Sequence, residues 1–404
     1  MSKLEELIKT LCPNGVEYKT IGEIAVEIFR GSGIKREQIS VTGTPCVRYG
    51  EIYTKYGVWF DKCISHTDES DIKNKRYFGY GDILFAITGE SVKDIAKCSA
   101  YTGHENCLAG GDIVVLRHKQ NPKYLSYALS TTNAIKQKSK GKVKSKVVHS
   151  SIPAIKKLII PLPPLPVQEE IVRILDTFTE LTAELTAELT ARKKQYEYYR
   201  YKLLINNPKS KPMSLGDIGP VSMCKRIMKA ETSSFGGVPF YKIGTFGKEA
   251  DAFISNETFE KYKKTYPYPH KGDILISAAG TIGRIVVFNG KPSYFQDSNI
   301  VWIDNDESKV LNTYLYYCYQ LQPWQASTGG TISRLYNDNI RKAIIPVPPL
   351  EEQQRIVEIL DRFDSLCNDL TRGLPAEIEA RQKQYEYYRD KLLSFPPLTK
   401  GERR

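Results

Sequence analysis

Apolar residues recur every three or four positions along two long stretches of the chain. This spacing places them on one face of a helix, as in helices that pack lengthwise against one another. The first stripe consists of Ile171, Ile174, Leu175, Phe178, Leu181, Leu185 and Leu189, and the second of Ile356, Ile359, Leu360, Phe363, Leu366, Leu370, Ile378 and Tyr385. At 1.5 Å per residue, arms of about 38 to 44 residues are roughly 57 to 66 Å long. We expect them to pair antiparallel as a long coiled coil.

Proline, glycine and acidic residues indicate where the two arms begin and break. Before the first arm, Pro161, Pro163, Pro164 and Pro166 predict extended chain. Glu169 and Glu170 then fall in the predicted opening turn, where the helix dipole favours negative charge. In the second arm, Gly373 and Pro375 predict a kink or short break, with Pro375 starting the next helical segment.

The two arms belong to an internal repeat. IKKLIIPLPPLPVQEEIVRILDTF at residues 155–178 returns as IRKAIIPVPPLEEQQRIVEILDRF at residues 340–363, and QYEYYR occurs at residues 195–200 and 384–389. Weaker matches precede them, such as GDILFAITG at residues 81–89 and GDILISAAG at residues 272–280. Such a repeat implies two copies of one structural unit.

The fold class that follows is α/β (α+β). Two globular domains are joined by two long antiparallel coiled-coil helices, with an internal pseudo-two-fold repeat. We place the first globular domain at residues 1–160 and its arm at 161–205. The second domain is placed at residues 206–345, its arm at 346–395 and a tail at 396–404. Because the repeat is continuous only when the C-terminus precedes the N-terminus, the two ends should lie close together.

Charge narrows the choice of partner. The 404-residue chain has a net charge of +12, and residues 113–168 contain no acidic residue. Lysines alternate with other residues over part of this region, at Lys136, Lys138, Lys140, Lys142, Lys144 and Lys146. Period-two spacing would align them along one side of an extended segment that follows a phosphate backbone. The alternative is an ordinary solvated lysine-rich loop.

Two further features concern location and metal binding. The chain has neither an apolar run of about 20 residues nor an N-terminal signal sequence, so we expect a cytoplasmic protein that does not enter membranes. The eight cysteines form no CxxC pair, which fits reduced thiols. Cys63, His66, His104 and Cys107 have zinc-like spacing, but the second globular domain has no equivalent. We therefore expect no metal site.

Catalytic motifs are missing from the sequence. It contains no [ND]-P-P-[YF] element for a flipped base, no G-x-x-x-x-G-K-[ST] phosphate loop and no H-E-x-x-H pair. Asp82 and Asp273, at matching places in Gly-Asp-Ile-Leu, are interpreted as turn residues. We expect no catalytic residue. The alternatives are a methyltransferase or nuclease in its own right, or a helical scaffold that does not bind nucleic acid.

Base recognition is assigned to polar, basic and aromatic residues near glycine-rich turns of the globular domains. Arginine and lysine can bond either guanine edges or phosphates. In the first domain the candidates are Arg30, Lys35, Arg36, Arg48, Tyr49 and Lys93, together with the six alternating lysines. In the second they are Lys225, Arg226, Lys229, Tyr241, Lys242 and Arg284.

The repeated QYEYYR motif is a candidate docking surface. Consecutive helical residues point about 100° apart, so three tyrosines in one motif cannot all face one partner helix. Tyrosine is also enriched at protein interfaces. The candidate partner-binding residues are Tyr196, Tyr198, Tyr199, Tyr385, Tyr387 and Tyr388. Alternatively, these tyrosines brace each arm against its own globular domain.

The order of globular domain, IPxPPL, E-x-Q-x-x-I-V-x-I-L-D-x-F and QYEYYR-x-K-L-L, twice over, resembles the specificity subunit of type I restriction–modification systems. The TAEL repeat at residues 182–189 is most similar to the spacer of the type IC branch. The resemblance implies a non-catalytic subunit whose two domains each read one half of a split double-stranded DNA target. It also implies that the arms set the gap and dock two modification subunits. Restriction subunits would join a larger complex, with S-adenosylmethionine, ATP and Mg on the partners and no cofactor in this chain.

Overall fold

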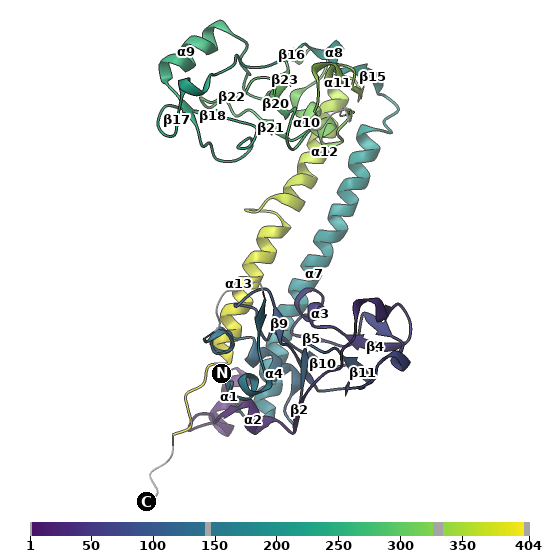
Figure 1. The fold of residues 1–404 in the computed structure, drawn as a ribbon, viewed down its shortest axis with the longest axis vertical. Helices are drawn as coiled ribbons and strands as arrows, with labels where there is room; N and C mark the ends of the chain where they lie inside the picture. Colours follow the sequence, from purple (N-terminus) through teal and green to yellow (C-terminus); the bar gives the residue numbers. More distant parts are fainter. Residues whose placement is uncertain (1, 142–146, 326–333, 400–404) are drawn as a thin grey trace, which may run out of the picture. The chain divides into compact units, whose positions relative to one another are not determined.

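The computed structural model describes residues 2–141, 147–325 and 334–399. The chain divides into two compact units (Figure 1). The first unit comprises Met1–Thr186 with Glu377–Arg404, and the second comprises Ala187–Ala376. Helix α7 (Leu165–Leu204) has 40 residues, of which the first part belongs to the first unit and the remainder to the second.

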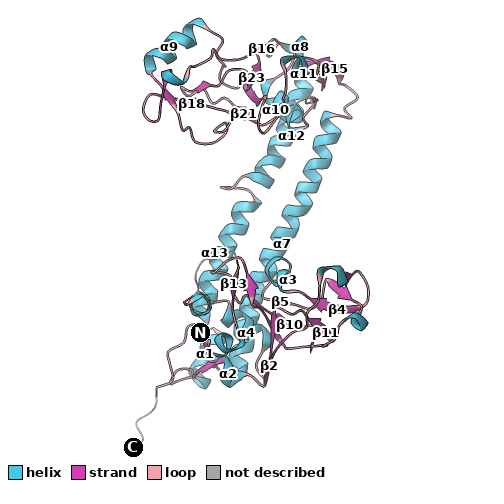
Figure 2. Cartoon of the chain, viewed as in Figure 1, coloured by secondary structure: helices cyan, strands magenta, loops and turns pink. Residues whose placement is uncertain are grey.

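The predicted arms are helical. The second arm consists of α12 (Leu350–Asn368) and α13 (Leu374–Leu392), with the break at the predicted place (Figure 2). In the first arm the prediction of extended chain as far as Pro166 is wrong, because α7 already begins at Leu165. A proline is tolerated in the first turn of a helix, where its missing N–H has no intrahelical acceptor.

Each unit pairs part of α7 with a segment of the second arm. In the first unit, Phe178 of α7 stacks on Tyr388 of α13 with ring centroids 5.4 Å apart. In the second unit, Tyr199 of α7 stacks on Phe363 of α12 at 5.7 Å. Beyond the C-terminal end of α7, Lys209 Nζ lies 3.2 Å from Glu352 Oε2 of α12, so residue numbers fall along α12 as they rise along α7 and past its end. The antiparallel pairing is therefore confirmed inside each unit.

Two five-stranded sheets form the globular part of the first unit. The first sheet has the order β2 (Glu27–Arg30), β12 (Ile113–Arg117), β8 (Ile83–Ala86), β10 (Cys98–Tyr101) and β5 (Trp59–Phe60). The second has the order β3 (Ile39–Ser40), β6 (Ser65–Thr67), β4 (Thr44–Val47), β11 (Cys107–Ala109) and β7 (Tyr77–Phe78). All residues of β8 are buried, as their continuous apolar run requires.

Short strand pairs and helices complete this unit. The strand pairs are β1 (Tyr18–Thr20) with β14 (Ile159–Pro161) and β9 (Thr88–Gly89) with β13 (Val148–His149). The helices are α1 (Lys3–Leu11), α2 (Ile21–Ile24), α3 (Tyr49–Thr54), α4 (Pro122–Leu129), α5 (Thr132–Ser139) and α6 (Ile152–Lys156).

The second unit repeats this plan with fewer strands in the described residues. One sheet has the order β16 (Val221–Ser222), β23 (Ile300–Ile303), β20 (Ile274–Ser277) and β21 (Ile285–Val287). The other has the order β17 (Thr232–Ser233), β19 (Phe253–Ile254), β18 (Val238–Tyr241) and β22 (Tyr294–Phe295). Strands β15 (Lys211–Ser214) and β24 (Ile344–Val347) pair as β1 and β14 do. The helices are α8 (Leu215–Ile218), α9 (Asn256–Thr265), α10 (Asn312–Gln320) and α11 (Asn337–Arg341). The predicted α/β class and internal repeat are confirmed.

Each arm is attached to its globular part by one buried tyrosine. The hydroxyl of Tyr127 in α4 donates to Asp176 Oδ1 of α7 at 2.7 Å, and Tyr317 in α10 donates to Asp361 Oδ1 of α12. These aspartates occupy the same place in the repeated I-L-D-x-F motif. The repeated Y-L-x-Y at residues 124–127 and 314–317 signals this attachment, and the sequence analysis missed it.

The two ends of the chain meet in the first unit, as the continuity of the repeat requires. Val16 and Pro397 form a parallel β-bridge, and Leu398 N donates to Val16 O at 2.9 Å. Gly15 lies at this contact with φ of 97°, and a Cβ there would lie 2.6 Å from the Pro396 carbonyl oxygen. Glycine is therefore needed both for the backbone angle and for the close approach.

The two equivalent aspartates are turn residues, as expected. Asp82 Oδ2 accepts from Gly79 N at 3.0 Å, and Asp273 Oδ2 accepts from His270 N at 2.7 Å. Across the described ranges, no group of three or more His, Cys, Asp or Glu side chains is placed to hold a metal ion. In the same ranges, no helix is both long and apolar enough to span a bilayer.

Candidate nucleic-acid interface and docking surface

Three of the predicted DNA-binding residues meet at one cleft of the first unit. Arg36, Arg48 and Tyr49 line a cavity of about 780 Å³ beside Gly33 and Asp112. Strand β4 ends at Val47, and the helix α3 that follows it presents Tyr49, which is 39% exposed. Arg36 is exposed, and no carboxylate of the described residues pairs with it. The cleft thus offers a cation and an aromatic ring to a ligand.

Two predicted DNA-binding arginines, Arg48 of this cleft and Arg30, whose partner Asp112 lines it, already contact acidic residues. Arg30 Nη2 lies 2.6 Å from Asp112 Oδ1, and its Nε donates to the Gly111 carbonyl. Arg48 Nε lies 3.6 Å from Glu51 Oε1, whose side chain is 8% exposed. These contacts fix the direction of both guanidinium groups. Lys35 and Arg36 are exposed, and neither is paired with a carboxylate of the described residues.

The expected extended run of alternating lysines is wrong where it is described. Lys136 and Lys138 lie in α5, and Lys140 is its C-cap residue, whereas Lys142, Lys144 and Lys146 lie outside the described residues. Asn133 and Ala134 continue a helix capped by Thr131, so the local pattern is helical and period two does not apply. Lys138 is consequently buried, with 8% exposure, and cannot contact a phosphate in this conformation.

Lys93 does not join the cleft. It is exposed in a turn near the N-terminal end of β10 and lines a different cavity of the same unit. Its counterpart in the repeat, Arg284, donates through Nη1 to the Phe246 carbonyl at 2.8 Å. The two residues therefore have different roles in the two units.

The candidates of the second unit are mostly paired. Arg226 Nε lies 2.9 Å from Asp297 Oδ2, and Lys242 Nζ lies 2.8 Å from Asp251 Oδ1. Tyr241 stacks on Phe295 at 5.7 Å. Lys229 is exposed at the start of a 3-10 turn before β17. Residues 243–247, equivalent to α3, form only a turn, so the second unit lacks the helical wall of the first cleft.

A basic and aromatic region of the second unit was missed from the sequence. Lys225 Nζ lies 5.2 Å from the centre of the Tyr266 ring. Lys263 Nζ lies 5.4 Å from the Tyr268 ring centre, and these residues line a cavity of about 550 Å³ with His270. The signal was present as EKYKKTYPYPHK at residues 260–271, where lysines alternate with aromatic and proline residues. Such surfaces suit nucleic acids because rings stack on bases and cations contact phosphates.

The repeated QYEYYR motif divides into inward and outward tyrosines. Tyr196 and Tyr385 are each 6% exposed, so they brace the arm, as the alternative interpretation proposed. Tyr199 and Tyr388 stack on Phe363 and Phe178 of the neighbouring helix. The expectation that all six tyrosines contact a partner is therefore wrong for the buried pair. Burial follows the helical period, since residues three apart share a face that points to the globular part and the paired helix.

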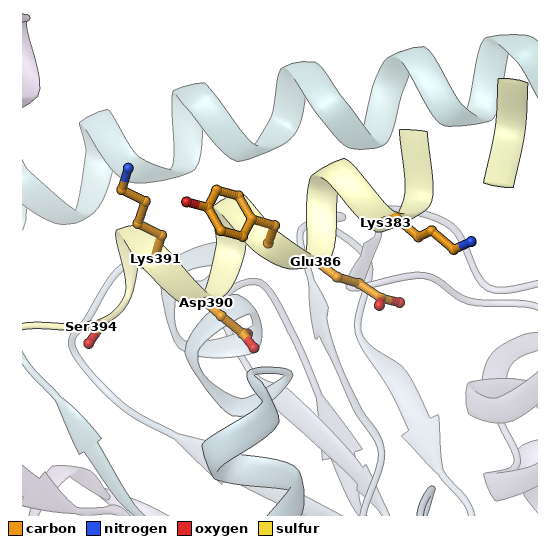
Figure 3. A pocket seen from close by; sticks show the side chains of 6 residues that line it. Lys383, Glu386, Asp390, Lys391 and Ser394 are labelled. Atoms are coloured by element: carbon orange, nitrogen blue, oxygen red, sulfur yellow. The ribbon is translucent and has the colours of Figure 1, made fainter. Parts of the chain in front are cut away.

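Tyr198 and Tyr387 point outward, with 60% and 61% of their surface exposed. The Nζ atoms of Lys202 and Lys391 lie 5.9 and 5.8 Å from the centres of these rings. On α13 the surroundings of Tyr387 form a shallow hollow lined by Lys383, Glu386, Asp390, Lys391 and Ser394 (Figure 3). We call these two surfaces the outer faces, defined by Lys194, Glu197, Tyr198, Tyr201, Lys202 and Ile205 on the first arm and by Lys383, Glu386, Tyr387, Asp390, Lys391 and Ser394 on the second.

The two-copy plan of sheets and arms agrees with the comparison to known families. The model of the type I restriction modification DNA specificity domain matches residues 13–192 and, a second time, residues 207–380. The chain belongs to this family. The two matches cover both repeats, so the type I specificity architecture accounts for nearly the whole chain.

Similar curated proteins are type I specificity subunits. The putative subunit S.HindORF215P of Haemophilus influenzae is 56% identical over 287 residues, which span 69% of this chain and 74% of that protein. The EcoR124I/EcoR124II specificity subunit of Escherichia coli is 35% identical over 261 residues, which span 60% of this chain and 64% of that protein.

Solved structures show the same fold at low sequence identity. The S subunit of a type I system from M. genitalium superposes with a TM-score of 0.52 and 16% identity, covering 95% of this chain and 97% of that one. A chain from a study of complex assembly and conformational transition of the type I R-M system gives a TM-score of 0.60 at 18% identity, covering 94% and 98%.

Proposed function

We propose that this protein is the non-catalytic subunit that gives a type I restriction–modification complex its DNA sequence specificity. Each globular part reads one half of a bipartite, asymmetric target in double-stranded DNA. The observation that carries the proposal is the double match of the specificity-domain family, one match to each repeat. In the first unit the reading surface is the cleft of Arg36, Arg48 and Tyr49. In the second it is the basic and aromatic surface around Lys225 and Tyr266.

The same proposal assigns the partners. Two modification subunits dock on the outer faces of the two arms, and restriction subunits join the larger complex. S-adenosylmethionine, ATP and Mg belong to those partners, and this chain supplies recognition and position. The support is that Tyr198 and Tyr387 expose the same ring with the same lysine beside it on both arms. A repeated exposed aromatic surface is suited to binding two copies of one protein.

The decisive experiment replaces the globular part of one unit. Residues 20–150 of this chain are replaced by the same region of a relative, and methylated sites are mapped across the genome of a host that carries the intact system. The expected result is a changed half-site on one side of the gap, with the other half-site and the gap retained. A change in both half-sites would show that the two units do not read DNA independently.

The arms are proposed to set the gap between the half-sites. Thr182–Leu189 holds two copies of TAEL inside α7, and each copy adds four residues, about 6 Å of straight helix. Four residues nearly equal one turn, so the apolar stripe rotates by only about 40°. Deletion of residues 186–189 should shorten the gap by about one or two base pairs of roughly 3.4 Å each.

Methylome sequencing measures that gap. A third TAEL should lengthen it by the same amount, with both half-sites unchanged. Deletion of only two residues rotates the stripe by about 200° and should abolish modification. An unchanged gap in active four-residue variants would contradict the spacing role.

A further inference from the structure

A cavity inside the first unit has no role in the proposed function. It has a volume of about 770 Å³ and lies among α4, α5, α7, α13 and the turn before β10. All its lining residues belong to the first compact unit. Apolar side chains form much of its wall, among them Val58, Trp59, Ile95, Leu129 and Ile135. It is therefore a feature of one unit that is distinct from the DNA cleft and shares only Glu386 with the outer face of the second arm.

Lys138 is the first unusual group of this cavity. Its side chain is 8% exposed, and its Nζ lies 3.7 Å from Cys98 Sγ and 5.8 Å from the Phe85 ring centre. Among the residues that the structure describes, no carboxylate pairs with it. Burial lowers the pKa of Lys138 because the ammonium loses its hydration. A buried ammonium without a counter-charge is costly unless something else pairs with it.

Tyr385 is a second buried polar group of the same cavity. Its side chain is 6% exposed, and burial raises the pKa of its hydroxyl, whereas the neighbouring side chains of Arg389 and Ser130 act in the opposite direction. Arg389, one turn further along α13, is 7% exposed and bonds Asp390 Oδ1 through Nε and Nη2 at 3.0 and 2.8 Å. Buried donors of this kind are normally satisfied, so their accumulation around one space needs a physical reason.

In the second unit, the arginine equivalent to Arg389 has a different hydrogen-bond partner. Arg200 of α7 corresponds to Arg389, and its Nη1 donates to Gln320 Oε1 at 3.1 Å. Gln320 lies six residues after Tyr314, and the residue six positions after the equivalent Tyr124 is Ser130. Ser130 lines the cavity, and its side chain is too short to provide the same acceptor. In the first unit Arg389 instead bonds the neighbouring Asp390, and the shorter Ser130, which lines the cavity, takes the place of Gln320.

The charges around the cavity define the chemistry of a ligand. The buried members, Lys138, Tyr385 and Arg389, are hydrogen-bond donors, whereas the acidic lining residues Asp94, Glu180 and Glu386 are exposed. We propose that this cavity binds a small molecule with an aromatic or alkyl body and a carboxylate, whose oxygens accept from Lys138 and Tyr385. The apolar wall covers the body of the ligand. A carboxylate supplies the charge that the lysine lacks, and charge-assisted hydrogen bonds are the stronger class.

Calorimetric titration of the full chain with 1-naphthoate tests the proposal. One saturable site per chain is expected, with the fluorescence of Trp59 changing on binding because this residue lines the cavity. The neutral analogue 1-naphthalenemethanol has the same ring body and should bind about tenfold or more weakly, as the charge-assisted bonds are lost. Equal binding of the two compounds, or no saturable binding of 1-naphthoate, would overturn the carboxylate site.

Two substitutions locate the site, and two matched controls lie on the same helices. Lys138→Met and Tyr385→Phe should each weaken 1-naphthoate binding, the first by about tenfold or more. Lys136→Met in α5 and Tyr387→Phe in α13 alter exposed residues and should bind as the unmodified chain does. Tyr385→Phe removes one hydroxyl and keeps the buried ring, so it should retain the fold even if Lys138→Met does not. Unchanged affinity in both cavity variants would refute the proposal.

Discussion

The two outer faces share one framework but differ at two positions. Tyr198 and Tyr387 have nearly the same exposure, and each ring meets the following tyrosine edge-on, with centroids 5.4 and 5.3 Å apart. Where the first arm has Tyr201 and Ile205, 55% and 42% exposed, the second has Asp390 and Ser394. The first outer face is therefore more apolar. Two copies of one partner would therefore contact the same tyrosine and lysines on both arms but different side chains at these two positions.

The contacts beneath the outer faces differ as well. In the second unit, Phe363 stacks on both Tyr196 and Tyr199, at 6.1 and 5.7 Å. In the first unit, Phe178 stacks on Tyr388 alone, while Tyr385 packs on Tyr127 of the globular part at 6.3 Å. An identical hexapeptide thus stabilises one unit through the neighbouring helix and the other partly through the globular part. Identical local sequence does not guarantee identical neighbours.

Replacing the arm phenylalanine of each unit, Phe363 or Phe178, should give the largest difference in the free energy of unfolding between the units. Phe363→Ala loses two ring contacts and should lower the free energy of unfolding by about 2–3 kcal/mol, whereas Phe178→Ala loses one and should cost about 1–2 kcal/mol. Urea unfolding followed by circular dichroism measures both. Leu370→Ala, at a 75% exposed position of the second arm, is a suitable control and should change little. A larger loss for Phe178→Ala would reverse the comparison.

Removing the exposed tyrosine should affect docking without unfolding either unit. Tyr198→Ala or Tyr387→Ala should each weaken capture of one modification subunit by about 2 kcal/mol or more, because aromatic residues often dominate interfaces. Analytical ultracentrifugation should show two bound partners falling towards one. Tyr196→Phe is the control, since this tyrosine is only 6% exposed and lies outside the outer face.

Exchange of the differing positions sharpens the docking comparison. Tyr201→Asp should make the first outer face bind as weakly as the second, and Asp390→Tyr should strengthen the second. If Tyr198→Ala and Tyr387→Ala both still bound two partners with unchanged affinity, the outer faces would not be docking surfaces.

The smallest expected effect is on stability in acid, and it should be similar in the two units. Glu170 bonds Arg173 and Lys3, and Glu352 bonds Arg355 and Lys209. These cations lower the pKa of each carboxyl from its ordinary 4.5 to about 2, chiefly through the hydrogen bonds from Arg173 and Arg355. A lowered pKa in the folded state stabilises the fold above about pH 4.5, and this contribution disappears as pH falls towards 2.

The acid effect is measured by urea unfolding at pH 6 and pH 3.5. Glu170→Gln and Glu352→Gln should each lose less stability between these two pH values than the unmodified chain does. Exposed Glu358→Gln on α12 serves as the control. Equal losses in all four proteins would show that neither ion pair contributes.

The long helices and the repeat could be predicted because they depend on local spacing. The stripe from Ile171 to Leu189 follows the helical period, and Gly373 and Pro375 predicted the break because glycine ends helices and proline favours a first helical turn. The prediction of an extended segment at Lys136 and Lys138 was wrong for a related reason. Lysines at every second position fit a strand, but the same residues can lie in a helix when Thr131 caps its N-terminus. Local charge patterns carry no information about which lysine becomes buried.

The candidate site could be predicted only in part. Arg36, Arg48 and Tyr49 meet at one cleft, although no sequence pattern predicted that they would lie together. Arg226 and Lys242 were chosen for their charge, but Asp297 and Asp251 from other segments already neutralise them. Pairings between residues far apart in sequence depend on sheet order and loop path, which no local pattern contains.

The two-copy organisation, the arms and the family can be predicted from the amino-acid sequence, because repeats and helical periodicity survive in any tertiary context. Which tyrosine of QYEYYR faces inward is set by tertiary packing, because it depends on the direction of the neighbouring helix and globular part. Tertiary packing also decided that Arg200 meets Gln320 whereas Arg389 lines a cavity. Identical side chains acquire different roles because burial and hydrogen bonding are set by neighbours that are remote in the chain.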